Sequence, residues 1–493
     1  MRRYLHIAAF IILISAGGLG CSKGLSDKVR TYRLDNGMTW LLLKRPSAPV
    51  FSGIVMVRVG GADEEMGKTG LAHMFEHMAF KGSSRIGTKN FEMERAILDE
   101  IEKLGEKMEA REDRAEPSDE DVAKLSEKIK ELEKKADAFR KKSEIWEIMK
   151  RNGARGLNAY TAKDVTAYFS SMPANRLELW TNVMAEMIFD PVYREFYTER
   201  AVVVDERRSL TENDPNRDMG EKLLETAFKD GPYHWSTIGY MEDIEDLTIA
   251  DAKRFHAKHY VPANMVGVLV GDIDIGDTKR ILRDVFGKFE KKPIPPSPPS
   301  AGEHGGDVVK KFNFDAEPSL AIAYHKPTLP DPSEYVFDVI TSLLCDGRSS
   351  RLKKRLVYDK RMVQELYCSD GYPGSRLDNL FLIWIDPMNG HSLQSILDEV
   401  MDELNRLKTE PIGKDELNRV RKQVKSGFLF VLDDNMGLAQ AMARFATIFG
   451  DWTLLDTYPK YIEKVGPNDV MRIAKKYLVN KNRVVVERHK GKR

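Results

Sequence analysis

Cysteine is scarce in this sequence, because the 493 residues include only Cys21, Cys345 and Cys368. Three cysteines exclude a disulfide-rich scaffold, and their spacing fits no zinc ribbon. A Cys345–Cys368 disulfide would need an oxidising compartment, and from the sequence alone we expect free thiols more than this disulfide.

An excess of charge of one sign is also missing. The chain has 77 Lys and Arg against 76 Asp and Glu, a formal net charge of +1. Nucleic-acid binding needs a surplus of Lys and Arg on one face, so nucleic acid is not an expected partner. Beyond residue 21 no apolar run has the length of a transmembrane helix, and the remaining chain is expected to be soluble.

The first 21 residues predict an export signal. Two arginines precede the short apolar stretch 7–14, and small residues then lead to Cys21. This ending resembles the lipobox of bacterial lipoproteins, in which the cysteine is acylated, although Gly18 stands where that motif usually has a large aliphatic residue. The alternative is a simple signal peptide cleaved close to the cysteine. We expect a periplasmic protein of the bacterial cell envelope, lipid-anchored to a membrane through Cys21.

A Pro-rich linker at residues 289–307 divides the rest into an N-terminal unit, residues 28–288, and a C-terminal unit, residues 308–493. The stretch from Ile244 to Val266 matches the stretch from Ile462 to Val484, about 218 positions later, in its order of apolar, helical and strand segments. We therefore predict an α+β fold of two similar α/β units, each a mostly antiparallel sheet flanked by helices.

The N-terminal unit is interrupted by a charged helical pattern. Apolar residues recur at spacings of three and four on both sides of a polar stretch that contains the helix-start signal Pro117-Ser118. We predict an inserted antiparallel helical hairpin at residues 104–150. Its high charge favours a solvated hairpin without a partner over a docking arm.

The segment His73-Met74-Phe75-Glu76-His77 carries the clearest chemistry, within a helix predicted over residues 71–81. Residues three and four apart share a helix face, so His73, Glu76 and His77 project together. Two imidazoles at this spacing form a clamp for Zn²⁺, and a carboxylate beside them can take a proton from water. Because the motif alone is not decisive, an amphipathic helix with two partly exposed histidines is the alternative.

A catalytic zinc needs a third protein ligand and an open position. A helix predicted over residues 195–212 offers Glu199 and Glu206, two turns apart on one face. Glu206 can reach the metal while Glu199 accepts a hydrogen bond from a ligand histidine. The alternative is an ordinary salt-bridged surface. The C-terminal unit has no H-x-x-E-H, so we expect one zinc per chain.

Together these segments resemble the pitrilysin and insulinase family, including its mitochondrial processing peptidase β-like branch. Residues 70–82 are similar to the zinc helix of that family, and residues 199–206 to the helix that bears the third ligand. Residues 156–166 are similar to its N-A-x-T-x-x-D-x-T edge strand. The resemblance runs from residue 28 to the end of the chain and is weaker in the second half.

This resemblance implies a zinc-dependent endopeptidase that hydrolyses unfolded peptides. It implies a zinc ion held by three side chains, namely His73, His77 and Glu206. Glu76 would be the general base, and Glu199 would orient a ligand histidine and help catalysis.

The resemblance also implies how substrates and partners bind. Asn158 and Ala159 would bind the substrate backbone, and an exposed strand edge can accept an extended peptide as an added strand. The family builds a chamber from two half-length chains or from one fused chain. We therefore expect this half-length chain to form a homodimer, or a heterodimer with a related chain.

Three departures from the family pattern stand out. The interval from His77 to Glu206 is longer than usual, which the hairpin explains without moving a ligand. The turn after the second strand is Gly60-Gly61-Ala62-Asp63-Glu64, where the family has a Gly-Ser-Arg-Tyr-Glu-like sequence. The Arg and Tyr that many members supply from the second half do not line up, so no such pair is assigned here.

Two other functions compete with the peptidase. One is a non-catalytic scaffold subunit, which keeps the family fold but loses the ligands. The intact ligand and base residues argue against it. The other is a lipid-anchored docking protein in which the hairpin is functional and the zinc structural; an open fourth metal position would argue against that.

Overall fold

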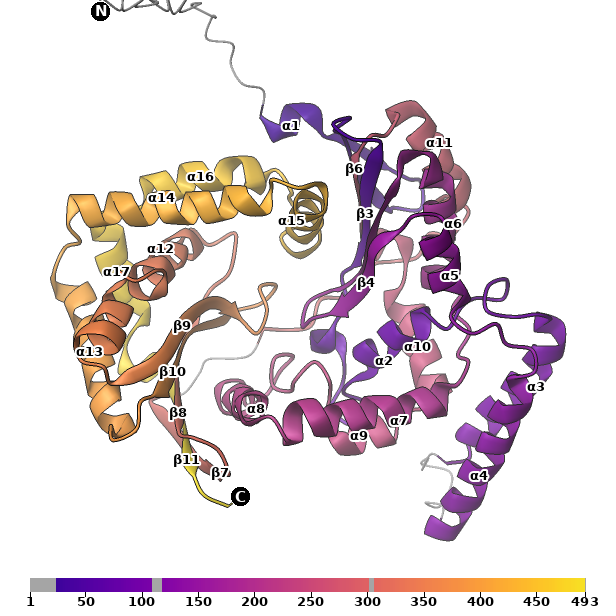
Figure 1. Ribbon diagram of the computed structural model, residues 1–493, viewed down its shortest axis with the longest axis horizontal. Helices are drawn as coiled ribbons and strands as arrows, with labels where there is room; N and C mark the ends of the chain where they lie inside the picture. The colour runs from indigo at the N-terminus through magenta and orange to yellow at the C-terminus, as the bar shows by residue number, and fades with distance from the viewer. Residues whose placement is uncertain (1–23, 109–117, 301–305, 493) are drawn as a thin grey trace, which may run out of the picture.

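The computed structural model describes residues 24–108, 118–300 and 306–492. Cys21 and the export signal lie outside these ranges. Figure 1 shows two α/β units side by side, the first in indigo to pink and the second in orange to yellow. None of the described helices combines the length and apolar character needed to cross a membrane.

The N-terminal unit is built on a six-stranded sheet in the order β1-β2-β6-β3-β5-β4. Only β2 and β6 pair in parallel, so the sheet is mostly antiparallel, as predicted. The strands are β1 (Arg30–Arg33), β2 (Thr39–Lys44), β3 (Val50–Val57), β4 (Arg155–Thr161), β5 (Thr166–Pro173) and β6 (Met265–Gly271).

The C-terminal unit repeats this arrangement in five strands, ordered β7-β11-β8-β10-β9. Its parallel pair is β7 and β11, which correspond to β2 and β6 of the N-terminal sheet. The strands are β7 (Val308–Phe314), β8 (Ser319–Lys326), β9 (Val363–Tyr372), β10 (Asn379–Pro387) and β11 (Arg483–Lys490). Helix α10 (Ile249–His259) leads into β6 as α17 (Pro467–Tyr477) leads into β11, which confirms two copies of one unit.

Helices cover these sheets and form the hairpin. Those of the N-terminal unit are α1 (Leu25–Lys28), α2 (Leu71–Ala79), α3 (Phe91–Gly105), α4 (Asp119–Ala136), α5 (Glu144–Arg151), α6 (Leu177–Phe189), α7 (Phe196–Arg207), α8 (Pro215–Ala227), α9 (Met241–Glu245), α10 and α11 (Ile275–Phe286). Those of the C-terminal unit are α12 (Ser333–Cys345), α13 (Leu393–Thr409), α14 (Lys414–Val431), α15 (Asn435–Ile448), α16 (Leu454–Lys464) and α17.

Helix α15 joins the two units. It contacts β3 and β6 of the N-terminal sheet, and Leu438 and Met442 are buried in a cluster with Ile54 and Val268. The opposite face of the same sheet packs on the helices of its own unit. With both faces covered, β3 is a nearly continuous apolar strand without polar alternation.

The predicted hairpin is formed by α3 and α4, which pack against each other and project from the body of the molecule (Figure 1). The side chain of Ser118 accepts a hydrogen bond from the backbone N–H of Asp121, so it caps α4 as its sequence indicated. The hairpin begins at Phe91, earlier than residue 104, and its return segment continues into α5.

Three sequence expectations need correction. Cys345 of α12 and Cys368 of β9 form a disulfide, where free thiols were favoured; their Cα atoms are 5.6 Å apart because the helix packs on the strand. The helix predicted over residues 195–212 is α7 followed by a π-helical turn at Arg208–Glu212. The helix predicted over residues 71–81 ends at Ala79.

Candidate metal centre

Helix α2 presents the two histidines because its opposite face is buried. Met74, Phe75 and Met78 pack into the core of the N-terminal unit. This fixes the rotation of the helix and leaves His73, Glu76 and His77 on the face toward α7, as the spacing predicted. The imidazole ring centroids of His73 and His77 are 4.8 Å apart.

Helix α7 brings Glu206 to the same point. Its Oε2 atom is 4.0 Å from Nε2 of His73 and 3.8 Å from Nε2 of His77. One ligand atom from each of these residues lies within 4.8 Å of the others, and no other such group of His, Cys, Asp and Glu occurs in the described parts of the chain. Two imidazole nitrogens and one carboxylate oxygen form a donor set that fits zinc.

The protonation of the two histidines differs. Burial and the neighbouring His77 lower the pKa of His73 to about 4, so its nitrogen lone pair is free to bind a metal at neutral pH. Burial also lowers the pKa of His77, but the hydrogen bond and charge of Glu199 outweigh burial and raise that pKa overall. His77 therefore keeps a proton to a higher pH than His73 does.

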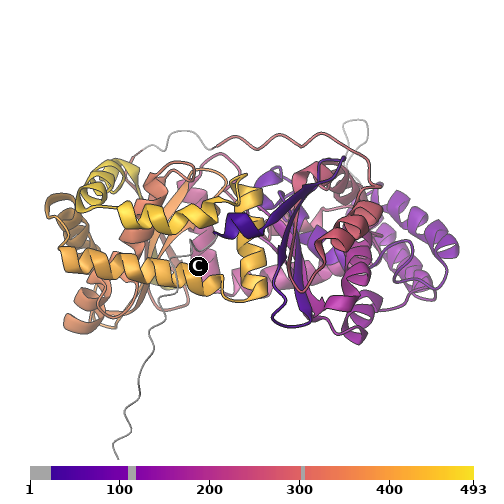
Figure 2. The same cartoon turned by 90° about the horizontal axis from the view of Figure 1, so that it is seen from above.

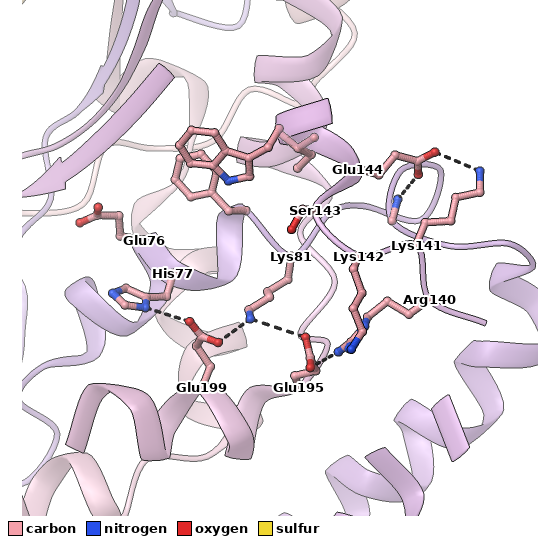
Figure 3. A pocket seen from close by; sticks show the side chains of 15 residues that line it. Glu76, His77, Lys81, Arg140, Lys141, Lys142, Ser143, Glu144, Glu195 and Glu199 are labelled. Atoms are coloured by element: carbon pink, nitrogen blue, oxygen red, sulfur yellow. Dashed lines mark hydrogen bonds and ion pairs between the residues drawn. The ribbon is translucent and has the colours of Figure 1, made fainter. Parts of the chain in front are cut away.

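Glu199 contacts His77, the histidine on the side of the group nearest to it. Its Oε1 atom is 3.1 Å from Nδ1 of His77, which leaves Nε2 facing Glu206. Burial acts to raise the pKa of Glu199, but hydrogen bonds from His77 and Lys81 lower it to about 2. Figure 3 shows this contact as the start of a chain of ion pairs through Lys81 and Glu195 to Arg140.

Glu76 lies beside His73, His77 and Glu206 without belonging to the metal-binding group. Thr161, at the end of β4, donates a 2.6 Å hydrogen bond from its hydroxyl to the Oε2 atom of Glu76. Burial raises the pKa of Glu76, which brings a carboxylate closer to the range that suits a general base. Thr161 belongs to the predicted edge-strand motif, but its contact with Glu76 was not foreseen.

Strand β4 forms the edge of the sheet beside this group. It pairs with β5 on one side, and no described strand pairs with its other side. Asn158 is exposed on this strand, whereas the side chain of Ala159 is buried. The edge therefore presents the residues predicted to bind a peptide backbone, next to Glu76.

Glu64 holds the start of α2, a role that sequence reasoning missed. Its carboxylate accepts hydrogen bonds from the backbone N–H groups of Gly70, at 3.0 Å, and Ala72, at 2.8 Å. Trp235 donates a third, at 3.1 Å. Burial raises the pKa of Glu64 and lowers that of its neighbour Lys163. The unusual turn at residues 60–64 thus ends in the residue that positions the zinc-motif helix.

Replacing Glu64 with alanine should destabilise the fold by about 2–4 kcal/mol, because two helix N–H groups lose their acceptor and buried Lys163 loses its carboxylate neighbour. The adjacent, exposed Glu65 provides the control, and Glu65→Ala should change little. Urea and thermal unfolding curves measure the difference. Equal midpoints for the two variants would contradict the role assigned to Glu64.

The chain matches two family profiles. The profile described as insulinase (peptidase family M16) matches residues 40–117 and 132–240, and the profile described as the peptidase M16 inactive domain matches residues 246–424. The first contains the whole candidate centre, and the second covers most of the C-terminal unit, which has no such group among its described residues.

Individual relatives agree with this assignment. The chain is 26% identical over 489 residues to the zinc protease PqqE of Helicobacter pylori, covering 97% of this chain and 96% of that protein. It is 22% identical to the β subunit of the mitochondrial-processing peptidase of Saccharomyces cerevisiae, covering 92% and 89%.

Solved structures show the same fold. A protease from Helicobacter pylori superposes with a TM-score of 0.78 at 24% identity, covering 94% of this chain and 99% of that one. A peptidase M16 inactive domain protein from Pseudomonas fluorescens gives a TM-score of 0.73 at 17% identity, covering 93% and 98%. With both profiles matched in order along one chain, this protein belongs to the pitrilysin and insulinase-like peptidase family M16.

Proposed function

We propose that this chain is a zinc-dependent endopeptidase that hydrolyses unfolded peptides outside the cytoplasm. The observation that carries the proposal is the convergence of His73, His77 and Glu206, with Glu76 beside them and not among the ligands. A structural zinc site needs four protein ligands, whereas three protein ligands leave a position open for water or substrate.

The roles of the residues follow from their positions. Bound zinc would act as a Lewis acid on the scissile carbonyl and would lower the pKa of the attacking water. Glu76 takes a proton from that water and returns it to the leaving amine, while Thr161 orients its carboxylate. The free edge of β4 at Asn158 and Ala159 aligns the peptide as an added strand.

We further propose a periplasmic location in a bacterial cell envelope, with a lipid anchor at Cys21. The Cys345–Cys368 disulfide supports an oxidising compartment, because such bonds are rare in the cytosol. Mass spectrometry of the protein extracted from membranes tests the anchor: an acylated N-terminal Cys21 supports it, and a soluble chain cleaved without lipid contradicts it.

A second chain is also part of the proposal. One relative is a β subunit of a processing peptidase, and a similar structure is part of a complex titled Complex III2 from Candida albicans. We propose that this chain pairs with itself or with a related M16 chain. The competing scaffold function would predict the fold without a metal-binding group, and the intact group argues against it.

The direct test is cleavage of quenched fluorescent peptides by the chain from Ser22 onward. Activity that a chelator removes and zinc restores would support the peptidase. Bound zinc at one ion per chain without cleavage would favour the scaffold function or a missing partner, and adding the partner separates these two.

Replacing Glu199 with glutamine should weaken zinc binding about 10- to 100-fold, because His77 loses the charged acceptor that orients it. A chromophoric chelator in competition measures the affinity. In the unmodified protein, affinity should fall as pH is lowered, since a proton on His77 competes with the metal and Glu199 raises the pKa of that histidine. Without Glu199 this loss should move to lower pH.

The exposed neighbour Asp205 on the same helix provides the matched control. Asp205→Asn should leave zinc affinity and its pH dependence unchanged. An unchanged affinity in the Glu199 variant would show that the hydrogen bond to His77 has no part in metal binding.

A further inference from the structure

An apolar groove lies where the described chain begins, at the seam between the two units. The groove encloses a cavity of about 620 Å³. It is lined by α1, by the turn from β2 to β3, by the end of α14 with the start of α15, and by α16. In Figure 1, and again from above in Figure 2, α1 lies beside the turn from α14 to α15. Figure 1 shows α2 well away from this turn, so the groove is separate from the candidate metal centre.

Helix α14 ends in three consecutive large apolar side chains that are exposed to solvent. These residues form the apolar tip: Leu429, Phe430 and Val431 are 58%, 81% and 53% exposed. On either side of the tip, Phe428 and Leu432 line the groove and pack on the apolar cluster that joins the units, so the tip has a fixed position. Large apolar side chains are mostly buried in folded proteins, and a group of them on one projection indicates a contact surface.

Helix α1 fixes the start of the described chain beside the tip. The backbone N–H groups of Leu25 and Ser26 donate to the carboxylate of Asp456 on α16, at 2.9 and 2.6 Å. The side chain of Leu25 packs on the cluster that joins the units. The three residues from Cys21 to Gly24 span at most about 11 Å even when fully extended. A lipid attached to Cys21 would therefore bring the face around α1 and the tip to the membrane.

We propose that the apolar tip is a membrane-binding surface, whose side chains enter the interfacial region of the lipid bilayer that holds the anchor at Cys21. Apolar side chains that enter this region add to the binding of an acyl chain, because binding strength scales with the apolar area that leaves water. The chain is then attached at two neighbouring points, which fixes its orientation on the membrane. This inference rests on the proposed lipid anchor and adds a second contact, made by the protein itself.

Charged residues of both signs surround the tip. They are Lys28, Lys44, Arg45, Asp433, Asp434 and Asp456. Because these charges offset one another, strong attraction to anionic lipids is not expected. Contact with the bilayer should come from the burial of apolar side chains, and it should depend little on ionic strength or on the charge of the lipids.

Strand β3 sets the distance between this face and the candidate metal centre. The turn that lines the groove leads into β3, and the eight residues of the strand rise about 26 Å to Val57. Val57 pairs with Thr166, which also pairs with Thr161, the residue that donates to Glu76. The tip and the centre therefore lie at opposite ends of the N-terminal sheet. Attachment through the tip holds the centre away from the bilayer, open to peptides in solution.

The first test measures how the chain from Ser22 onward, which has no anchor, binds to vesicles of phosphatidylethanolamine and phosphatidylglycerol in a flotation assay. Phe430→Ser should lower the partition coefficient about 10-fold, because a phenyl ring no longer leaves water on binding. Phe430→Leu should retain most of the binding. Vesicles of phosphatidylcholine should bind the unmodified chain about equally well.

Met66 provides the matched control, since it is 62% exposed but follows the far end of β3. Met66→Ser should leave the partition coefficient unchanged. The second test uses the acylated full chain in the same vesicles, with an environment-sensitive fluorophore attached at Phe430→Cys or at Met66→Cys. Cys345 and Cys368 form a disulfide and leave the new thiol to be labelled. Nitroxide-labelled lipids should quench the fluorophore at position 430 and not the one at position 66.

The outcomes separate this inference from the proposed function. Absence of lipid quenching at position 430 in the acylated chain would overturn the inference and leave both the anchor and the peptidase intact. If Phe430→Ser dissociates an oligomer in sedimentation without changing vesicle binding, the tip is an interface between chains, which also overturns it. If Cys21 carries no lipid, the proposed anchor fails, and the partition coefficients of the chain from Ser22 onward still decide whether the tip binds membranes.

Discussion

Replacement of Glu76 by glutamine is expected to lower kcat/KM for peptide cleavage about 1,000-fold while zinc stays bound. Glutamine keeps the shape and can still accept the hydrogen bond from Thr161, but an amide cannot take a proton from water. Because His73, His77 and Glu206 are unchanged, the metal-binding group is retained. The loss should therefore fall on kcat, with little change in KM.

Metal analysis and initial rates on the same preparation are the required measurements. Glu92→Gln, at an exposed glutamate on α3, is a control that should retain full activity. If Glu76→Gln still cut peptides at the unmodified rate, another group would be the base. If it lost zinc together with activity, Glu76 would belong to the metal ligands and the open position would be in question.

Replacement of Arg376 by methionine is expected to destabilise the protein by about 3–5 kcal/mol, because it leaves a buried carboxylate unpaired. Arg376 belongs to the C-terminal unit, is only 2% exposed, and donates to Oδ2 of Asp63 in the N-terminal unit at 2.9 Å. Beside it, the backbone N–H groups of Ser375 and Arg376 donate to Asp164, and Tyr233 donates to the same carboxylate.

Urea unfolding measures the effect, and Arg348→Met, at an exposed arginine of the same unit, is the control. A second substitution, Asp63→Asn, should cost less in the Arg376→Met background than alone, since the two residues share one interaction. Strictly additive losses would show that the pair does not couple the units. Unchanged stability in the single variant would contradict the buried ion pair itself.

Local patterns were enough to predict the repeated architecture. The match between residues 244–266 and residues 462–484 rests on side-chain periodicity, which depends only on neighbours in sequence. The metal-binding group was predictable for a similar reason. His73 and His77 are one turn apart, and Glu199 and Glu206 are two turns apart, so each pair needed only its own helix to form.

Contacts between distant segments were beyond such reasoning. Thr161 reaches Glu76 across 85 positions, and Arg376 reaches Asp63 across 313. Thr161 lies in the edge-strand motif, but nothing in the sequence around Thr161 or Arg376 indicates which residue it contacts. Glu64 was noticed only as a departure from the family turn, because its hydrogen bonds to Gly70 and Ala72, six and eight residues later, leave no periodic signal in the sequence.

Residues 290–300 of the Pro-rich linker are mostly exposed and run along the outside of the molecule (Figure 2). The interface between the units is made elsewhere, by α15 on the N-terminal sheet and by the loop around Arg376. The linker therefore sets the effective concentration of one unit with respect to the other. The contacts that hold the two units together are made by their own surfaces. The single chain is equivalent to a tethered heterodimer. We therefore expect two separately expressed units to associate through the same interface.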